Sequence, residues 1–291
     1  MANGSPDSDN VVLEPFSGSG KRQARTAARF REIIYGHYRN NPRSLPWRET
    51  DDPYCIFVSE FMLQQTQVER VRQKYGPFLT TFPDYRTLAQ VPLRDVLGGW
   101  RGLGYNRRAV ALQSCARRVT EEFRGQLPSD SDLLVTFPGI GPATAGAICA
   151  FAFRKPAVFV ETNIRRVFLH FFFRGRDRVR DGEIFPLVAA TLDRADPRTW
   201  YYALMDYGVM LKRTCLNPNR KSAHYTRQAP FDGSNRQIRG EIVRLLIERA
   251  AIALPEIVAL VGQERERIEK NLFRLQREGL VTERDGRYFI P

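Results

Sequence analysis

The stretch LVTFPGIGPATAGAICAFAFRKPAVFVETNIRRVF, residues 134–168, is the part of the sequence that best indicates the fold. Its apolar lead-in meets a Pro-Gly-Ile-Gly-Pro turn, and an alanine-rich run from Ala143 to Ala152 follows. Gly139 and Gly141 allow backbone angles closed to other residues and a close approach to another surface. The turn also exposes the free N–H groups that begin the next helix, and such groups bind anions such as phosphate.

An acidic residue follows the turn about twenty positions later. Glu161 precedes Thr162 and Asn163 at the expected start of another helix. A phosphate-binding turn, a spacer and a carboxylate are what an enzyme acting on a nucleic-acid backbone requires. A Gly-x-Gly turn alone is weak evidence for phosphate binding. The helix that follows this turn and the acid at Glu161 make the indication more specific.

The composition indicates a globular protein with an anionic partner. The chain has 291 residues, enough for two domains, and 43% of them are hydrophobic. Lys and Arg number 45 against 32 Asp and Glu, which gives a formal net charge of +13. Such a balance favours nucleic acid as the partner, with an anionic membrane surface second. A basic protein with neither partner stays open as an alternative.

The cysteines and the hydropathy exclude several classes. Cys55, Cys115, Cys149 and Cys215 all lie more than thirty residues apart, so no zinc or iron–sulfur spacing exists. We interpret them as reduced thiols of a cytoplasmic protein. No apolar stretch approaches eighteen residues, which predicts no membrane span. Residues 1–21 have no signal-peptide hydrophobic region and are predicted to be a disordered tail.

Two long helices are expected near the start of the chain. The first spans about residues 22–38, and the second spans about residues 54–75. The first half of the second helix is mostly apolar, yet Glu60 lies inside it. Burial raises the pKa of a carboxyl group, and a raised pKa in a cleft is how a general acid is made. A glutamate paired with an arginine for structure is the alternative interpretation.

Shorter helices punctuated by Pro and Gly follow. They are expected at about residues 85–90, 93–100, 106–123, 131–136 and 201–211. A glycine-rich corner ends at Tyr105, which is either an ordinary packing residue or a wedge that enters a base stack. The aromatic run from Phe168 to Phe173 is interpreted as core rather than as a stacking platform.

The last part of the sequence predicts a linker and a small second domain. Residues 216–236 lose periodicity, and residues 237–291 form the small unit. Asp285-Gly286 predicts a β-hairpin there, and the expected helices are at about 238–249, 254–261 and 264–278. Three helices and a hairpin resemble a winged helix-turn-helix. Its third helix interleaves basic and acidic residues, so DNA contact and a structural or protein-binding role both stay open.

Several motifs resemble the helix-hairpin-helix (HhH-GPD) DNA glycosylases. Residues 134–152 resemble the hairpin of that superfamily. Three motifs resemble its adenine glycosylase (MutY-type) branch: LPWR at 45–48, VSEFMLQQTQV at 58–68 and GLGY at 102–105. The resemblance covers about residues 22–215. It implies an all-α fold of two helical lobes with the active site in the cleft between them, and a target base flipped into a pocket.

The resemblance assigns roles residue by residue. Glu60 resembles the catalytic glutamate that protonates the departing base, and Glu161 falls where the family has an aspartate that stabilises the sugar cation. Gln65 and Tyr105 match residues that intercalate where the base left. The expected base pocket consists of Leu45, Trp47, Arg48 and Asn163. The expected DNA-binding residues are Gln64, Gln65, Tyr105, Arg108, Gly139, Gly141, Ala143 and Thr144.

Four departures from the family refine these expectations. Glu161 replaces the aspartate and adds one methylene of about 1.5 Å. Ala143 stands where relatives resembling endonuclease III carry a Schiff-base lysine, so strand cleavage is not expected. The four-cysteine iron–sulfur loop is missing, with Cys215 as its candidate remnant, and no cofactor is expected beyond a monovalent cation at the hairpin Pro138 to Gly141. The winged unit stands in the place of the 8-oxoguanine-recognition domain.

The sequence therefore predicts a monofunctional base-excision-repair DNA glycosylase that acts on adenine in a mispair. The alternative is a mismatch glycosylase for thymine, uracil or 5-modified uracil opposite guanine, because such enzymes also keep a Pro-Trp-Arg and a glutamate. A non-catalytic DNA-binding protein derived from a glycosylase is an alternative of another class. The expected partner is double-stranded DNA with a mispaired or damaged base. It is bound by a monomer in the cytoplasm, at the nucleoid in a prokaryote.

Overall fold

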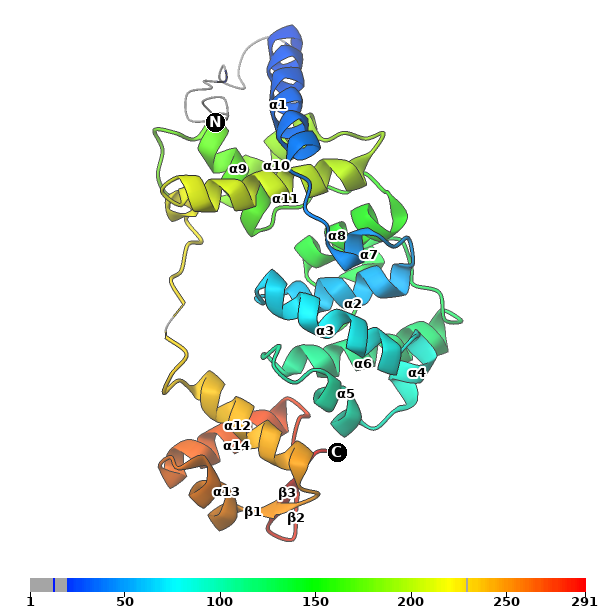
Figure 1. The fold of residues 1–291 in the computed structure, drawn as a ribbon, viewed down its shortest axis with the longest axis vertical. Helices are drawn as coiled ribbons and strands as arrows, with labels where there is room; N and C mark the ends of the chain where they lie inside the picture. Colours follow the sequence, from blue (N-terminus) through cyan, green and yellow to red (C-terminus); the bar gives the residue numbers. More distant parts are fainter. Residues whose placement is uncertain (1–12, 14–19, 229) are drawn as a thin grey trace, which may run out of the picture. The chain divides into compact units, whose positions relative to one another are not determined.

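The computed structural model describes residues 13, 20–228 and 230–291. Helices account for nearly all of the regular structure, which confirms the predicted all-α class (Figure 1). None of the described helices is long and apolar enough to cross a membrane. The predicted disordered tail falls mostly outside the described residues, and its last two residues, Gly20 and Lys21, begin the first helix.

Contacts divide the chain into two compact units, each built from two separate stretches of sequence. Unit 1 comprises Met1–Ser44 and Cys149–Arg227, and unit 2 comprises Leu45–Ile148 and Gln228–Pro291. Helix α8 (Pro142–Phe153) runs from unit 2 into unit 1. The contacts group the end of the chain with its middle part, so the predicted boundaries of a glycosylase domain and a winged domain stay a prediction.

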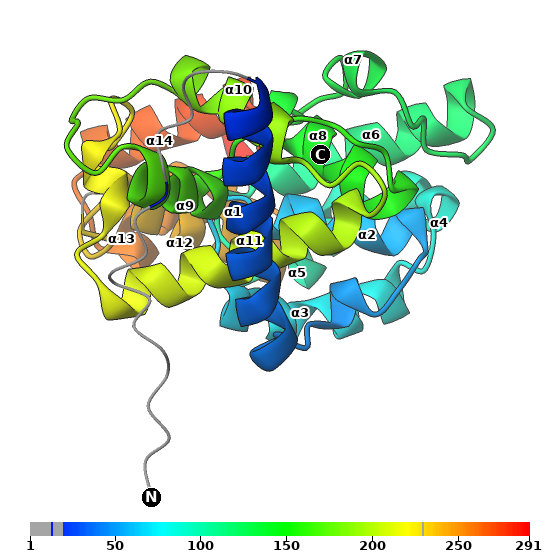
Figure 2. The same cartoon turned by 90° about the horizontal axis from the view of Figure 1, so that it is seen from above.

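Unit 1 is built around an aromatic core. Its helices are α1 (Gly20–Asn40), α9 (Thr162–Phe172), α10 (Asp181–Thr191) and α11 (Pro197–Thr214), and a short 3-10 helix, η3 (Pro218–Lys221), follows them. Helix α1 crosses α11 (Figure 2) and also packs on α10. The ring of Phe30 is fully buried and lies within 5.8 Å, centre to centre, of the rings of Phe168, Phe171, Phe172 and Trp200. The aromatic run is therefore core, as predicted.

The first part of unit 2 is an array of short helices. They are η2 (Pro46–Arg48), α2 (Pro53–Leu63), α3 (Val68–Thr81), α4 (Tyr85–Gln90), α5 (Leu93–Gly99), α6 (Arg107–Glu122) and α7 (Ser131–Leu134), followed by the start of α8. Helix α2 packs on α3 and α6, and both α4 and α5 pack against α6. The fully buried rings of Phe57, Phe61, Phe78 and Trp100 form part of the core.

The long helix predicted at residues 54–75 is two helices, so that prediction was wrong. Helix α2 ends at Leu63 and α3 begins at Val68, with a turn between them. Gln65 in this turn has a left-handed backbone, with φ of 53°. The turn contains neither Gly nor Pro, so tertiary contacts rather than local propensity end the helix.

The C-terminal part of unit 2 has the predicted order of a winged helix-turn-helix. Its elements are α12 (Asn235–Glu248), β1 (Ile252–Ala253), α13 (Leu254–Val261), α14 (Arg265–Arg277), β2 (Thr282–Arg284) and β3 (Arg287–Phe289). The strands form an antiparallel sheet in the order β1-β3-β2, with Tyr288 opposite both Ile252 and Glu283. Asp285 and Gly286 both have positive φ, as the predicted Asp-Gly turn requires.

The first part of the predicted linker, residues 216–236, packs on unit 1. The 3-10 helix η3 contacts α9, Asn219 is buried, and Ser222 forms a parallel bridge with Val179. Helix α10 was not predicted from the sequence, because Pro186 lies inside it. Both features brace the first turn of α9, where Glu161 stands.

Candidate active site

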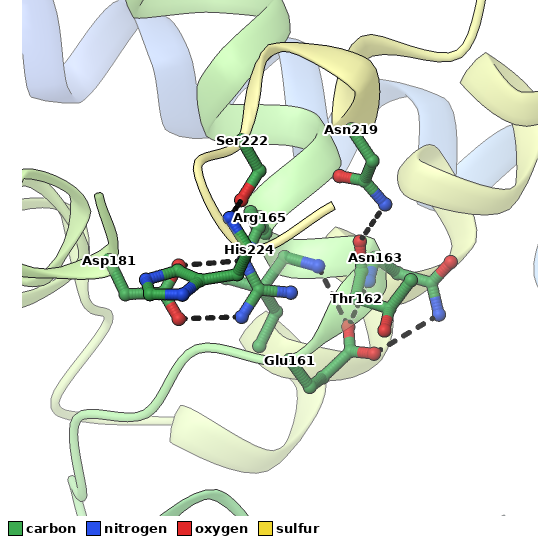
Figure 3. Close-up of polar contacts among 9 residues, drawn as sticks. Glu161, Thr162, Asn163, Arg165, Asp181, Asn219, Ser222 and His224 are labelled. Atoms are coloured by element: carbon green, nitrogen blue, oxygen red, sulfur yellow. Dashed lines mark hydrogen bonds and ion pairs between the residues drawn. The ribbon is translucent and has the colours of Figure 1, made fainter. Parts of the chain in front are cut away.

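Glu161 is the N-cap residue of α9. Its Oε1 accepts hydrogen bonds from the backbone N–H groups of Asn163 and Ile164, both at 2.7 Å (Figure 3). Its Oε2 accepts from Asn163 Nδ2 at 3.4 Å. A carboxylate here satisfies the unpaired amides of the first helical turn and interacts favourably with the positive end of the helix dipole. The local structure therefore fixes both carboxylate oxygens.

The electrostatic environment of Glu161 contains opposing effects. Burial raises the pKa of the carboxyl group, and this is the largest effect. The amides of Asn163 and Ile164, together with the guanidinium groups of Arg165 and Arg166, lower it, and the pKa is raised on balance. Burial thus favours the protonated form of Glu161, and the two amides and two guanidinium groups offset part of that effect.

Arg166 links the first turn of α9 to α11. Its guanidinium donates to Asn163 Oδ1 and to the backbone oxygen of Gly208, both at 2.7 Å, and to Asn217 Oδ1 at 3.2 Å. Arg166 is 3% exposed. Because the Asn163 side chain in turn donates to Glu161, Arg166 positions the carboxylate indirectly, through Asn163.

Gly208 makes the close approach of α11 to α9 feasible. A Cβ at this position would lie 2.6 Å from the backbone oxygen of Asn163 and 2.8 Å from its Cβ. Both distances are far below normal van der Waals contact. This role was not predicted, because the contact joins residues distant in the chain.

A second set of polar contacts fixes α9 from the other side (Figure 3). Arg165 forms a two-point ion pair with Asp181, with distances of 2.7 and 2.6 Å, and it lowers the pKa of that carboxyl group. Asn219 of η3 donates from Nδ2 to the backbone oxygen of Thr162 at 3.0 Å. The segment after Cys215 is therefore tied to α9 by polar side chains.

The four cysteines are free thiols. Cys115 and Cys149 are buried, and burial raises the pKa of the Cys115 thiol to about 12. Over residues 13, 20–228 and 230–291, no three His, Cys, Asp or Glu side chains gather closely enough to hold a metal ion. The thiol of Cys215, the C-cap residue of α11, donates to the backbone oxygen of Leu211 at 3.0 Å.

Glu60 and most of the predicted pocket residues lie in unit 2. Glu60 is partly exposed on α2, next to the buried Phe61. Leu45 and Trp47 are buried beside η2, which packs on α2, and Trp47 makes an edge-to-face contact with Tyr75 at 5.6 Å. Arg48 is partly exposed at the end of η2, and the fourth pocket residue, Asn163, lies in unit 1.

The two glycines of the hairpin between α7 and α8 differ in their surroundings. Gly139 is packed against neighbouring side chains, and Gly141 is not. Gly139 has φ of +73°, and a Cβ there would lie 2.8 Å from Ala111 Cβ and 3.3 Å from the ring of Phe61. Gly141 has an ordinary φ and no atom within 4 Å of a Cβ, so its backbone does not require glycine, contrary to expectation. Pro138, Gly139 and Gly141 are exposed, so the hairpin tip is accessible.

Gln64 joins this hairpin to the end of α2. Its Nε2 donates to the backbone oxygen of Gly139 and to Thr144 Oγ1, both at 3.2 Å. Ala143 and Thr144, in the first turn of α8, are partly exposed. Gln64 therefore acts as a brace between two expected DNA-contact segments.

Arg108 is buried, and its guanidinium donates hydrogen bonds to the end of α2 and to the neighbouring loops. It donates to the backbone oxygens of Phe61 and Met62 at 2.7 and 2.9 Å, which are terminal carbonyls of α2. It also donates to Thr66 Oγ1 at 2.8 Å and to the backbone oxygens of Leu103 and Gly104. Burial lowers the pKa of Arg108 to about 10. The predicted DNA-binding role of Arg108 would thus be indirect, through the loops that it holds.

Comparisons with known proteins identify the family. The HhH-GPD superfamily of base excision DNA repair proteins matches residues 58–182. The chain is 32% identical over 277 residues to the adenine DNA glycosylase of Mycolicibacterium smegmatis, and the match covers 88% of this chain and 93% of that protein. The chain therefore belongs to the HhH-GPD superfamily of base excision DNA repair proteins.

Other relatives match over a smaller part of their length. The adenine DNA glycosylase of Buchnera aphidicola subsp. Baizongia pistaciae is 32% identical over 196 residues, which cover 66% of this chain and 54% of the relative. That of Mycobacterium tuberculosis (strain H37Rv) is 42% identical over 131 residues, which cover 45% of this chain and 43% of the relative. The chain thus spans about half the length of these two relatives.

Solved structures share the fold. A thermostable thymine-DNA glycosylase superposes with a TM-score of 0.59 at 22% identity, covering 71% of this chain and 99% of that one. Endonuclease III in a non-covalent DNA complex superposes with a TM-score of 0.53 at 18% identity, covering 62% of this chain and 85% of that one. These likenesses confirm the predicted helical glycosylase fold.

Proposed function

We propose that this protein is a DNA glycosylase that removes adenine from a mispair and leaves the strand intact. The match to the adenine DNA glycosylase of Mycolicibacterium smegmatis along nearly the whole of both chains supports the substrate. The observation that carries the mechanism is the carboxylate of Glu161, held by two backbone amides at 2.7 Å in a partly buried position.

In this proposal Glu161 stabilises the sugar. Breaking the N-glycosidic bond builds positive charge on the deoxyribose, and a fixed carboxylate lowers the energy of that cation. The longer side chain is accommodated because it folds back onto the first turn of α9 instead of extending away from it. Asn163 and Arg166 keep its second oxygen oriented.

Glu60 acts as the acid that protonates the departing base. A neutral base leaves more readily than an anionic one, so a proton donor at the base contributes about 10²–10⁴-fold to the rate. Leu45, Trp47 and Arg48 contribute to the base pocket, and η2, which carries Trp47 and Arg48, packs on α2. Asn163 is the fourth residue of the predicted base pocket.

The proposed partner is double-stranded DNA, bound by a monomer. The hairpin tip at Gly139 and Gly141 presents backbone amides to a phosphate, with Ala143 and Thr144 in the turn behind it. A monovalent cation at Pro138 to Gly141 is part of the proposal. Gln65 and Tyr105 enter the duplex as wedges. The net charge of +13 supports a polyanionic partner, and we place the protein in the cytoplasm, at the nucleoid in a prokaryote.

The proposal of base removal without strand cleavage, and without an iron–sulfur cluster, rests on the residues present. Ala143 has no amine, and a Schiff base to the sugar needs one. The scattered cysteines give a cluster no set of thiolates. The reaction proposed here uses water as the nucleophile and two carboxyl groups.

Two other functions are alternatives to the proposed removal of adenine. The first is a mismatch glycosylase for thymine, uracil or 5-modified uracil opposite guanine, because the Pro46-Trp47-Arg48 motif is compatible with both branches. A non-catalytic DNA-binding protein is disfavoured, because the fold positions an acid at 161 with three polar contacts that a released position would not need.

The experiment uses labelled duplexes with A:8-oxoG, A:G, T:G, U:G and 5-hydroxymethyluracil:G pairs. Each reaction is split, and one half is treated with hot alkali. Cleavage of the adenine strand that requires alkali is the expected result. Cleavage of a pyrimidine strand alone would move the protein to the other branch, and cleavage without alkali would refute the monofunctional assignment.

Two substitutions then separate an enzyme from a binding protein. Glu60→Gln and Glu161→Ala are expected to abolish base release while duplex binding persists. A parent protein that binds the mispairs and releases no base from any duplex would instead support the non-catalytic alternative.

A further inference from the structure

The C-terminal part of unit 2 is docked on the loop that carries Tyr105. Arg94 of α5 donates from Nε to the backbone oxygen of Ile247 at 2.8 Å, at the end of α12. Arg101, at the start of the loop, forms an ion pair with Glu248 at 3.2 Å. Helix α12 therefore packs beside α5 and the loop that follows it.

At its other end, α12 reaches the Tyr105 side chain. Gln228 Nε2 and a guanidinium nitrogen of Arg236 both donate to the Tyr105 hydroxyl oxygen, the latter at 3.3 Å. Arg236 also donates to the backbone oxygen of Pro230 at 3.3 Å and lies over the ring of Phe231. Arg236 is thus also held by contacts within its own segment.

The same tyrosine is held from within the helical array. The guanidinium of Arg108 lies 5.7 Å from the centre of its ring, and Tyr105 has φ of 48°. A left-handed backbone is costly for a non-glycine residue and persists where surrounding contacts hold it. Tyr105 is 37% exposed, so the contacts restrain it without covering it.

The C-terminal part itself offers little to attract DNA. Residues 235–291 contain 11 basic and 9 acidic side chains, so their formal charges nearly cancel. The whole chain, by contrast, carries a formal net charge of +13. On α14, Arg265 pairs with Glu269 at 2.9 Å and Lys270 pairs with Glu266 at 2.6 Å. Two of the five basic side chains of α14 are therefore matched by acids on their own helix.

We propose that the C-terminal part is a positioning device for the Tyr105 wedge, acting through Gln228 and Arg236 rather than as a separate DNA reader. This inference rests on the proposed function, in which Tyr105 enters the duplex. Holding the hydroxyl from one side and the ring from the other keeps the side chain in one conformation. A wedge fixed in advance loses less conformational entropy when it inserts, which favours the mispaired duplex over a fully paired one.

The first test needs no DNA. Amide hydrogen exchange is measured over residues 101–106 in the full chain and in Gln228→Ala, Arg236→Met and Tyr105→Phe variants. Lys270→Gln, on α14, is the matched control. Each of the three variants is expected to speed exchange in this loop about fivefold, the factor for one ordinary hydrogen bond, and Lys270→Gln is expected to leave it unchanged. Unchanged exchange in the three variants would overturn the inference, whatever base the protein removes.

The second test measures selectivity. The ratio of affinities for a mispaired and a fully paired duplex is compared across the same variants in the Glu60→Gln background. A fall of about fivefold is expected for Arg236→Met and Tyr105→Phe, with no further fall when the two are combined. Additive effects, or an equal effect of Lys270→Gln, would overturn the inference. Failure of the parent protein to release any base would refute the proposed function but leave the exchange result to decide the positioning role.

Discussion

Gln65 and Tyr105 share a left-handed backbone, with φ of 53° and 48°, and one buried guanidinium, that of Arg108, holds both of their turns. Arg108 donates to Thr66 Oγ1 in the first turn and to the backbone oxygens of Leu103 and Gly104 in the second. Two strained residues thus sit at the tips of two loops with a common internal support. Strain of this kind gathers at functional sites, which agrees with the intercalating role proposed for both.

Arg108→Met should therefore damage both loops at once. The methionine fills most of the space but leaves the carbonyls of Phe61, Met62, Leu103 and Gly104 without their charged donor. We expect a loss of about 3 kcal/mol or more in the free energy of unfolding, and a lower preference for mispaired DNA. Denaturant unfolding measures the first, and competition binding measures the second. Arg107→Met, at the exposed neighbour, is the control, and an equal loss there would contradict the assignment.

The two hairpin glycines should differ in their sensitivity to substitution by alanine. Gly139→Ala places a Cβ 2.8 Å from Ala111 Cβ on a left-handed backbone, and we expect it to cost about 2 kcal/mol. Gly141→Ala has open space and an ordinary backbone, so stability should stay within about 0.5 kcal/mol of the parent. Thermal unfolding compares them.

DNA binding provides a separate test of Gly141. Gly141→Glu places a negative charge at the exposed tip and should weaken binding to every duplex about equally, because phosphate contacts carry no sequence information. An effect confined to one base sequence would argue against a phosphate grip at this hairpin.

The sequence predicted the parts of the fold that local signals determine. Leu254–Val261 was predicted with the bounds that α13 has, and the Asp285-Gly286 turn has the backbone that its residues favour. The break after Leu63 was missed because Arg108, forty-five positions along the chain, caps the end of α2. No residue within that turn signals a helix end.

In the candidate site, too, local motifs identified some residues, and tertiary packing determines others. Glu60 and Glu161 were selected from their local motifs, and the N-cap position of Glu161 agrees with the expected start of α9. Arg166 and Gly208 were not selected, because their contacts with Asn163 come from tertiary packing. The roles of the site residues stay predictions until the substitutions are made.

Glu161→Gln should raise stability at neutral pH. Burial raises the pKa of the folded-state carboxyl group above its usual 4.5, so the fold favours the protonated form. That contribution is complete below pH 4.5 and is lost as the pH rises through the raised pKa, where ionisation destabilises the fold. Glutamine stays neutral and keeps an oxygen for the two amides, so its advantage should appear above that pKa and vanish below pH 4.5.

Thermal unfolding across pH checks this, with Glu121→Gln on the exposed face of α6 as the control. Base release by Glu161→Gln should fall about 10²–10³-fold, since the sugar cation loses its carboxylate. A gain in stability without a loss of base release would show that the carboxylate is structural. Equal pH profiles for the parent and Glu161→Gln would contradict the raised pKa.

Gly208→Ala tests the support behind Glu161, with Gly240→Ala as its matched control. Both glycines lie inside helices, where alanine gains about 0.5–1 kcal/mol of helical stability. At Gly240 nothing lies within 4 Å of a Cβ, so the gain should appear in full. At Gly208 the Cβ meets the backbone of Asn163 at 2.6 Å, and overpacking of about 1–3 kcal/mol should outweigh it.

The clash should also move the first turn of α9. Because Arg166 bonds to both Gly208 and Asn163, a shift of α11 displaces the groups that orient the Glu161 carboxylate. We expect single-turnover base release by Gly208→Ala to fall about tenfold or more while duplex affinity stays near that of the parent, since displacement of about 1 Å at a reacting group costs up to 10²-fold. A stabilised Gly208→Ala with full activity would show that α11 does not position this carboxylate.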